Sequence, residues 1–311
     1  MKKALICLSF SAVLVGIIWR SAVVDLRCEE VAPVMAESDI YSELKAFMVE
    51  SEFDPIEPRL DPVFEFVPGL YGLAVDFELS YQNMLSHGQF DPNLIAGEAV
   101  PYEGNPEDFR QHRIYKGNEH SPYVGLLINV AWGSEELDEI LDILDEHNVL
   151  ASIFFEGKFA DNHHEQVRDV LSRGHLIGNH SYSHPADWLS FSYDEFQEEI
   201  VLTNDILRSI TGEEVIYFAP PGGAFTEDTI RAAYDQGMYT ILWSADSIDW
   251  RGEPAHVLVE RVMTRLEPGG LILTHPKPET VRALPEIIDR VRGEGLEFRR
   301  VDDIVHGRRG G

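Results

Sequence analysis

The chain has 311 residues, of which 44% are hydrophobic, so it can bury the core of one large domain and a smaller one. Its 25 basic and 54 acidic residues give a formal net charge of −29. This charge argues against nucleic acid as a partner, because phosphate binding requires clustered lysine and arginine. The acid-rich, lysine-poor composition suits salty or alkaline surroundings, and it equally suits an ordinary acidic surface.

The N-terminus has the pattern of an export signal. Met1-Lys2-Lys3 precedes an apolar run from Ala4 to Trp19, and no convincing cleavage pattern follows closely. Residues 1–28 are therefore interpreted as a signal or membrane anchor, with the remainder outside the cytoplasmic membrane. Both cysteines, Cys7 and Cys28, lie in this segment, so no disulfide framework or thiolate metal site is expected in the folded part.

The next two segments are less regular. Residues 29–61 are acidic and contain proline, which is typical of a linker. Residues 62–121 are interpreted as a small accessory module with a short helix over residues 80–85.

Residues 122–308 form the main predicted domain, in which strands alternate with helices. The predicted strands cover residues 124–130, 150–155, 175–178, 215–218, 239–243 and 271–274. The predicted helices cover residues 134–147, 165–173, a stretch opened by the Ser192 and Glu195 capping box, 227–236, 255–266 and 280–294. This alternation predicts a mostly parallel α/β sheet or barrel with its site at the carboxyl ends of the strands.

Residues that can carry chemistry follow each of these strands. They are Ala131-Trp132, Glu156, His180 with His184, Pro220-Pro221-Gly222, Asp246 with Asp249-Trp250, and His275. Because the carboxyl ends of parallel strands share one rim, we expect these residues to gather there.

His180 and His184 are the strongest candidates for metal ligands. Imidazoles four residues apart face the same way if the segment turns helically, so both can reach one ion. The stretch that would supply a carboxylate, Ile128-Asn129-Val130-Ala131-Trp132-Gly133, has none. The alternative is that both histidines hydrogen-bond to backbone in a site that has lost its metal.

These motifs resemble the NodB-homology polysaccharide deacetylases, carbohydrate esterase family 4, over about residues 122–308. His180 to His184, Asp246-Ser247-Ile248-Asp249-Trp250 and Leu273-Thr274-His275 match three of the family's five motifs. In this comparison the aspartate that serves the family as base falls on Ala131, its metal-binding aspartate falls on Trp132, and its arginine falls on Ala219. The Ile-Asn-Val-Ala-Trp-Gly unit is similar to a divergent branch linked to sporulation in endospore-forming bacteria.

The resemblance implies a distorted (β/α) barrel that removes acetyl groups from N-acetylated chitin or peptidoglycan, with a divalent metal such as Zn²⁺ or Co²⁺. It implies His275 as the general acid and Asp246 as the residue that orients it. It also implies that Gly222 supplies an oxyanion contact through its backbone N–H, and that Leu273 and Trp250 wall the acetyl pocket.

Three positions remain open at this stage. Glu156 is our preferred replacement for the third metal ligand, with Glu135 and Asn129 as alternatives. Trp132 either packs in the core where a carboxylate was lost or binds substrate by stacking on a sugar. Asp249-Trp250 either closes a loop or, through Trp250, stacks on a sugar.

Two functional hypotheses follow. One is a tethered, extracytoplasmic polysaccharide deacetylase with altered and slow metal chemistry. The other is a pseudoenzyme of the cell or spore envelope that binds glycan without turnover.

Overall fold

The computed structural model describes residues 37, 39–49 and 54–308, which form two compact units. The smaller unit takes the described residues up to Asp54 and Gly72–Val100, and the larger takes Pro55–Tyr71 and the described residues from Pro101 onward. The predicted signal or anchor segment lies outside the described residues. None of the described helices combines the length and hydropathy that a membrane crossing requires.

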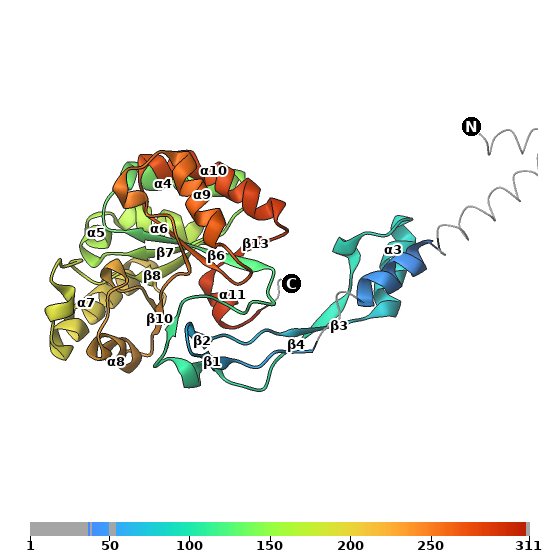
Figure 1. The fold of residues 1–311 in the computed structure, drawn as a ribbon, viewed down its shortest axis with the longest axis horizontal. Helices are drawn as coiled ribbons and strands as arrows, with labels where there is room; N and C mark the ends of the chain where they lie inside the picture. The colour runs from blue at the N-terminus through green and yellow to red at the C-terminus, as the bar shows by residue number, and fades with distance from the viewer. Residues whose placement is uncertain (1–36, 38, 50–53, 309–311) are drawn as a thin grey trace, which may run out of the picture. The chain divides into compact units, whose positions relative to one another are not determined.

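The larger unit is built on one mostly parallel sheet, whose strands run in the order β1-β2-β5-β10-β9-β8-β7-β6-β12-β11 (Figure 1). Strand β13 pairs in parallel with the first part of β6. The strands are β1 Arg59–Asp61, β2 Glu65–Val67, β5 Arg113–Ile114, β6 Tyr123–Val130, β7 Ser152–Phe155, β8 Leu176–Asn179, β9 Tyr217–Phe218, β10 Tyr239–Ile241, β11 Ala245–Asp246, β12 Leu271–Thr274 and β13 Glu297–Arg299. Each predicted strand is present, and all pairings from β5 to β11 are parallel, as expected.

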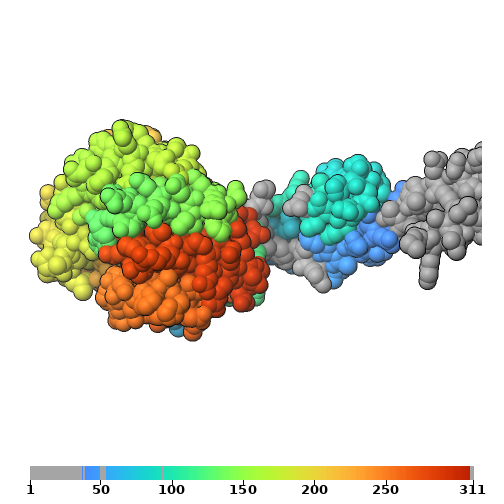
Figure 2. Space-filling view, turned by 90° about the horizontal axis from the view of Figure 1, so that it is seen from above, coloured from blue at the N-terminus to red at the C-terminus, as the bar shows by residue number. Residues whose placement is uncertain are grey.

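Helices cover the outer face of this sheet (Figure 1). They are α4 Ser134–Glu146, α5 Gly157–Asn162, α6 His164–Ser172, α7 Tyr193–Thr211, α8 Glu227–Asp235, α9 Ala255–Arg265 and α10 Pro278–Gly293. The short helix α11 Val301–Val305 packs instead on the inner side of the sheet, where Val301, Ile304 and Val305 are buried. The predicted capping box is confirmed, since the Ser192 hydroxyl and the Glu195 carboxylate each accept from the other residue's backbone N–H. On the surface, α10 lies between α4 and α9 (Figure 2).

The strand side chains form two apolar layers, one on each face of the sheet, and this arrangement sets which side chains reach the rim at the carboxyl ends of the strands. Alternate strand residues face either the helices or the inside of the curved sheet. The inner layer includes Leu127, Phe154, Tyr217, Ile241 and Leu273, all buried. The same alternation, continued past the ends of β6, β7, β8 and β12, directs the following side chains towards the inner side of the rim.

The smaller unit has its own core. Strands β3 Gly72–Val75 and β4 Gly97–Val100 pair antiparallel, and α3 Phe77–His87 is capped by the Asp76 carboxylate. Residues 39–49 are helical, and Ile40 and Leu44 from this helix are buried together with Met84 of α3.

The observed units divide the chain differently from the predicted linker and accessory module. Residues 39–49 of the predicted linker are helical, because Ile40 and Leu44 have the four-residue spacing that places both on one face. Residues 62–121 are split between the units, because Phe66 and Ile114 pack into the inner layer of the larger one.

Candidate functional site

His180 and His184 lie together at the end of β8, but on an irregular turn instead of the helical turn we expected. Their ring centroids are 5.0 Å apart. Ser181 and His184 have φ values of 65° and 45°, in the left-handed region that residues with a Cβ rarely adopt. The spacing therefore brings the rings together, as predicted, through a strained backbone that surrounding contacts must hold.

Glu199 of α7 supplies those contacts. Its carboxylate accepts hydrogen bonds from the backbone N–H of Tyr182 at 2.9 Å, from the N–H of Ser183 at 2.8 Å and from the Ser183 hydroxyl at 2.7 Å. Glu199 was not among the site residues predicted from the sequence. A signal was present, since Glu199 lies beside the buried face formed by Phe196 and Ile200.

The His180 imidazole is fixed in one tautomer. Its ring is buried, and its Nδ1–H donates to the Ala219 carbonyl at 2.7 Å, which leaves the Nε2 lone pair free of that bond. Burial lowers the pKa of His180 to about 3, and His184 beside it adds to the effect. Burial also lowers the pKa of His184. Both rings are therefore neutral near pH 7.

His275 is oriented by Asp249, and the prediction that Asp246 does this is wrong. The Asp249 carboxylate accepts from His275 Nδ1–H at 2.7 Å, from the His275 backbone N–H at 2.6 Å and from the Thr280 hydroxyl at 2.7 Å. Asp246 instead accepts from the Ile248 backbone N–H at 2.8 Å. Both aspartates belong to the motif Asp246-Ser247-Ile248-Asp249-Trp250, and in the folded loop the Asp249 side chain is the one that contacts His275.

Asp249 is ionised although it is fully buried. Burial raises the pKa of its carboxyl, but the hydrogen bond and charge of His275 outweigh burial, so the net pKa is lowered. The Asp249 carboxylate thus accepts a charge-assisted hydrogen bond from the His275 imidazole, and Thr280 satisfies a further lone pair of the carboxylate.

The Trp132 ring lies between the rings of His184 and His275. It is nearly parallel to that of His275, at a centroid distance of 6.0 Å and 11°, and meets the His184 ring edge-on at 6.1 Å. The Lys277 ammonium is 5.0 Å from the indole centroid. The side chain is 39% exposed, so the interpretation of Trp132 as core packing is wrong.

The donor set does not fit the divalent metal that the fold implies. No group of three or more His, Cys, Asp or Glu side chains in the described chain could hold an ion, so Glu156 does not complete a ligand set with His180 and His184. Glu156 is the N-cap residue of α5, and burial raises its pKa. Glu135 lies in the first turn of α4. Because structural and catalytic zinc sites use three or four protein ligands, two histidines are insufficient.

The other predicted binding residues occupy the rim and the layer below it. Trp250 is 57% exposed, and Gly222 is exposed with φ of 61° and open space where a Cβ would stand. Leu273 is buried in the inner layer. The Oδ1 atom of Asn129 is buried and has no hydrogen-bond partner in the described chain. The site is thus an aromatic and histidine-lined rim over an apolar floor.

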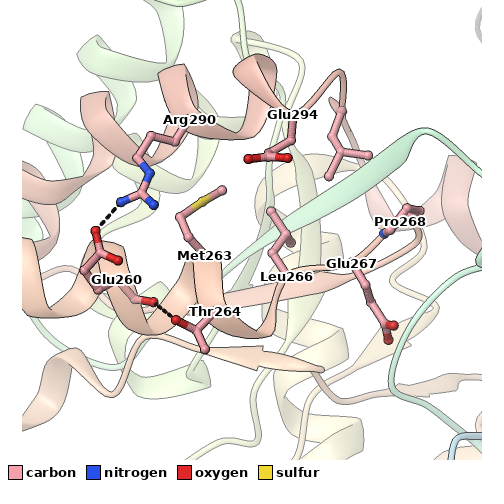
Figure 3. Close-up of a pocket in the computed structure, with 9 residues that line it drawn as sticks. Glu260, Met263, Thr264, Leu266, Glu267, Pro268, Arg290 and Glu294 are labelled. Atoms are coloured by element: carbon pink, nitrogen blue, oxygen red, sulfur yellow. Dashed lines mark hydrogen bonds and ion pairs between the residues drawn. The ribbon is translucent and has the colours of Figure 1, made fainter.

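Two cavities of the larger unit lie away from this rim. One, of about 370 Å³, is formed by α9, α10 and the segments that follow them (Figure 3). Its walls include Glu260, Glu267 and Glu294, and Arg290 pairs with Glu260 across it. The other, of about 460 Å³, is lined by residues near the amino ends of β8 and β9 and by residues of α11. None of the predicted site residues lines either cavity.

Comparison with known proteins identifies the family to which the chain belongs. The family model for polysaccharide deacetylase matches residues 116–241. The uncharacterized protein YlxY of Bacillus subtilis (strain 168) is 34% identical over 280 residues, covering 90% of this chain and 88% of that protein. A peptidoglycan-N-acetylglucosamine deacetylase of Bacillus cereus is 32% identical over 253 residues, covering 75% of this chain and 92% of the relative.

Solved structures add the pseudoenzyme comparison. The chain is similar to BA3943 of Bacillus anthracis, described as a CE4 family pseudoenzyme, with TM-score 0.79 and 33% identity over 88% of this chain and 96% of that one. A BA3943 mutant described as having restored enzymatic activity gives the same TM-score of 0.79 at 32% identity, over 88% of this chain and 100% of that one. With the catalytic aspartate pair replaced by Ala131 and Trp132, the chain is a divergent or inactive member of the polysaccharide deacetylase family, carbohydrate esterase family 4.

Proposed function

We propose that this protein is a pseudoenzyme that binds N-acetylated glycans of the cell or spore envelope and does not deacetylate them. The observation that carries the proposal is the position of Trp132. Its indole packs against the rings of His184 and His275, where the family's metal-binding aspartate falls in the sequence. An indole has no lone pair to offer a metal, since its N–H only donates.

The residues that remain can orient a ligand but cannot complete the hydrolysis. His275 keeps a fixed tautomer through Asp249, so its Nε2 faces away from the carboxylate and is available to a ligand. No carboxylate stands at Ala131 to take a proton from water. Loss of a general base costs on the order of 10² to 10⁴ in rate, before loss of the metal is counted.

The rim is suited to binding a sugar. Aromatic rings stack on the apolar faces of sugar rings, and Trp132 and Trp250 are both exposed. A Gly222 backbone with open space around its Cα position lets an acyl group approach closely. We therefore assign recognition of the N-acetyl sugar to Trp132, Trp250 and Gly222, over the apolar floor that includes Leu273.

We further propose that the protein works outside the cytoplasmic membrane, held or exported by residues 1–28. The support is the basic start and the apolar run from Ala4 to Trp19. Envelope glycans are found on that side, which makes the proposed location and ligand consistent with one another.

The decisive experiment measures acetate release and binding together. Protein lacking residues 1–28 is incubated with chito-oligosaccharides and peptidoglycan fragments, with and without Zn²⁺ or Co²⁺, and binding is followed by calorimetry. We expect binding without acetate release. The Ala131→Asp/Trp132→Asp double variant is expected to bind the metal and to gain turnover.

The competing hypothesis gives a different result. Metal-dependent acetate release by the native protein, abolished by His180→Ala, would establish a deacetylase with an unrecognised ligand or base and overturn the pseudoenzyme proposal. Glu156→Gln would then show whether Glu156 supplies that group.

A further inference from the structure

The second cavity of the larger unit lies at the opposite end of the sheet from the histidine rim. Its volume is about 460 Å³, and it is lined by residues near the amino ends of β8 and β9 and by residues in and beside α11. This volume falls within the range of small-molecule sites in proteins. A molecule in this cavity and a ligand at the rim would therefore occupy different places.

Arg300 and Asp302 are held at the wall of this cavity by each other and by the backbone. Arg300 Nη1–H donates to the Gly174 carbonyl at 3.0 Å, and Nη2–H donates to Asp302 Oδ2 at 3.0 Å. Arg308 lies 3.8 Å from the same Asp302 oxygen. All four residues line the cavity. Because Gly174 directly precedes His175, another lining residue, these contacts join His175, Arg300 and Asp302 in one polar cluster.

The His175 ring is buried, with 1% exposure, and is fixed in one tautomer. Its Nδ1 accepts from the Ala151 backbone N–H at 3.1 Å, so the ring hydrogen is on Nε2. Burial lowers the pKa of His175 to about 4, so the ring is neutral near pH 7. The buried Nε2–H has no hydrogen-bond partner in the described chain. His175 therefore presents one unused donor.

Two further atoms of the cluster are buried without a partner among the described residues. They are Nε of Arg300, which is a donor, and Oδ1 of Asp302, which is an acceptor. Folded proteins rarely leave such atoms unpaired, because each one loses its hydration without compensation. The two donors and the acceptor therefore require partners from whatever fills the cavity.

The chemistry of these atoms defines the groups that would satisfy them. The N–H donors of His175 and Arg300 need an oxygen acceptor, and a guanidinium group binds a carboxylate most strongly. The Asp302 carboxylate needs a donor, and an ammonium group binds it most strongly. One molecule that carries both a carboxylate and an ammonium group would meet both requirements.

The charge of the lining also favours such a molecule. Arg300 and Arg308 are opposed by Glu213, Glu214 and Asp302, so the lining has no excess of positive charge. These carboxylates and the formal charge of −29 repel a simple anion, but not a zwitterion without net charge. The apolar part of the lining favours an aliphatic group over water. It consists of Leu171, Leu176, Ile177, Val215 and Ile216.

We propose that this cavity is a second binding site, separate from the rim, for a free amino acid with an aliphatic side chain. The carboxylate of the amino acid accepts from His175 Nε2–H and Arg300 Nε–H, and its ammonium group donates to Asp302 Oδ1. The aliphatic side chain lies against the apolar lining. The proposal does not depend on glycan binding at the rim.

The test compares leucine with two analogues by calorimetry on the full-length protein. Isocaproate lacks the ammonium group of leucine, and isoamylamine lacks its carboxylate. We expect one enantiomer of leucine to bind and both analogues to bind at least about tenfold more weakly, because each lacks a charged hydrogen-bonding group. In ¹⁵N NMR, leucine should also shift the His175 Nε2 resonance.

A pair of variants tests the role of Asp302. Asp302→Asn removes the charge that binds the ammonium group and is expected to weaken leucine binding by about tenfold or more. Asp303→Asn is the matched control, because Asp303 is also in α11 and 3.8 Å from Arg308 but does not line the cavity. It should leave the affinity unchanged. Thermal unfolding shows whether each variant is folded, and the comparison of analogues needs neither variant.

The outcomes decide between a ligand site and a cavity filled by water. No binding of either leucine enantiomer, with an unchanged His175 resonance, would mean that water alone fills the cavity and would overturn the proposal. Equal binding of isocaproate and leucine would overturn recognition of the ammonium group. Equal effects of Asp302→Asn and Asp303→Asn would overturn the assignment to this cavity.

Discussion

The Asp249 carboxylate is the group whose removal tests the site geometry most directly. It is fully buried and accepts three hydrogen bonds, two from His275 and one from Thr280. Asp249→Ala leaves all three donors without their acceptor and removes the partner of the partly buried His275 imidazole. Removing one partner of such a buried pair costs about 3–5 kcal/mol.

Asp246→Ala is the control, because the same loop carries both aspartates. Asp246 is only part-buried, and its carboxylate accepts one hydrogen bond, from the Ile248 backbone N–H at 2.8 Å. Loss of a single such bond costs about 1 kcal/mol. The two variants are therefore expected to differ in stability by about 2–4 kcal/mol, which follows from the two preceding values.

Urea unfolding followed by circular dichroism measures this difference, with ¹⁵N NMR of His275 as a second readout. Asp249→Ala should lower the unfolding midpoint strongly and release the His275 ring from its fixed tautomer, while Asp246→Ala should leave the tautomer unchanged. If Asp246→Ala proves as destabilising as Asp249→Ala, or shifts the His275 tautomer, the assignment of Asp249 as the orienting residue is refuted.

Three further predictions concern the histidine turn and the indole. Glu199→Gln should cost about 1.5–3 kcal/mol in urea unfolding, because it weakens charged hydrogen bonds to the turn, whereas the exposed neighbour variant Glu198→Gln should cost almost nothing. The pKa of His180 is about 3 in the folded protein, below the ordinary value of 6.5. Between these two pH values the unfolded chain binds a proton on His180 that the folded protein does not bind. The free energy of unfolding should therefore decline as the pH falls from 6.5 to about 3. This slope, about 1.4 kcal/mol per pH unit for one proton, should diminish in His180→Asn, and an unchanged acid unfolding profile would contradict the buried neutral imidazole. Trp132→Ala should weaken glycan binding by about two- to tenfold in calorimetry, and unaltered affinity would remove Trp132 from the binding surface.

The helices and strands of the larger unit could be predicted because each is marked by a pattern of residues within its own segment. The buried face of Leu137, Ile140, Leu141 and Leu144 defines α4 within thirteen residues, and the capping box at Ser192 marks the start of α7. The helix α5 was missed because its six residues are too few to show a helical period. The unit boundaries were also missed, because they depend on Ile114 pairing with strands far from it in the sequence.

Some features of the candidate site could also be predicted from the sequence, and others could not. That Ala131 and Trp132 cannot act as base or ligand follows from their side chains, whatever the fold. The residue that orients His275 could not be identified in this way, because Asp246 and Asp249 are both in the motif. Only the folded loop, which has a left-handed φ of 55° at Ile248, places the Asp249 carboxylate against His275. Glu199 belongs to none of the motifs, since it acts on the turn from another helix, and its place beside the buried face of α7 was the one signal in the sequence.

The sequence by itself determined the alternation of strands and helices, the gathering of polar residues at the carboxyl ends of the strands and the loss of the paired aspartates at Ala131 and Trp132, because each depends on side-chain chemistry and local periodicity. Only the tertiary structure decided that Trp132 lies exposed against two histidines and that Glu156 does not complete a metal site. These features depend on distances between side chains from different strands and helices, which no single segment of the chain specifies.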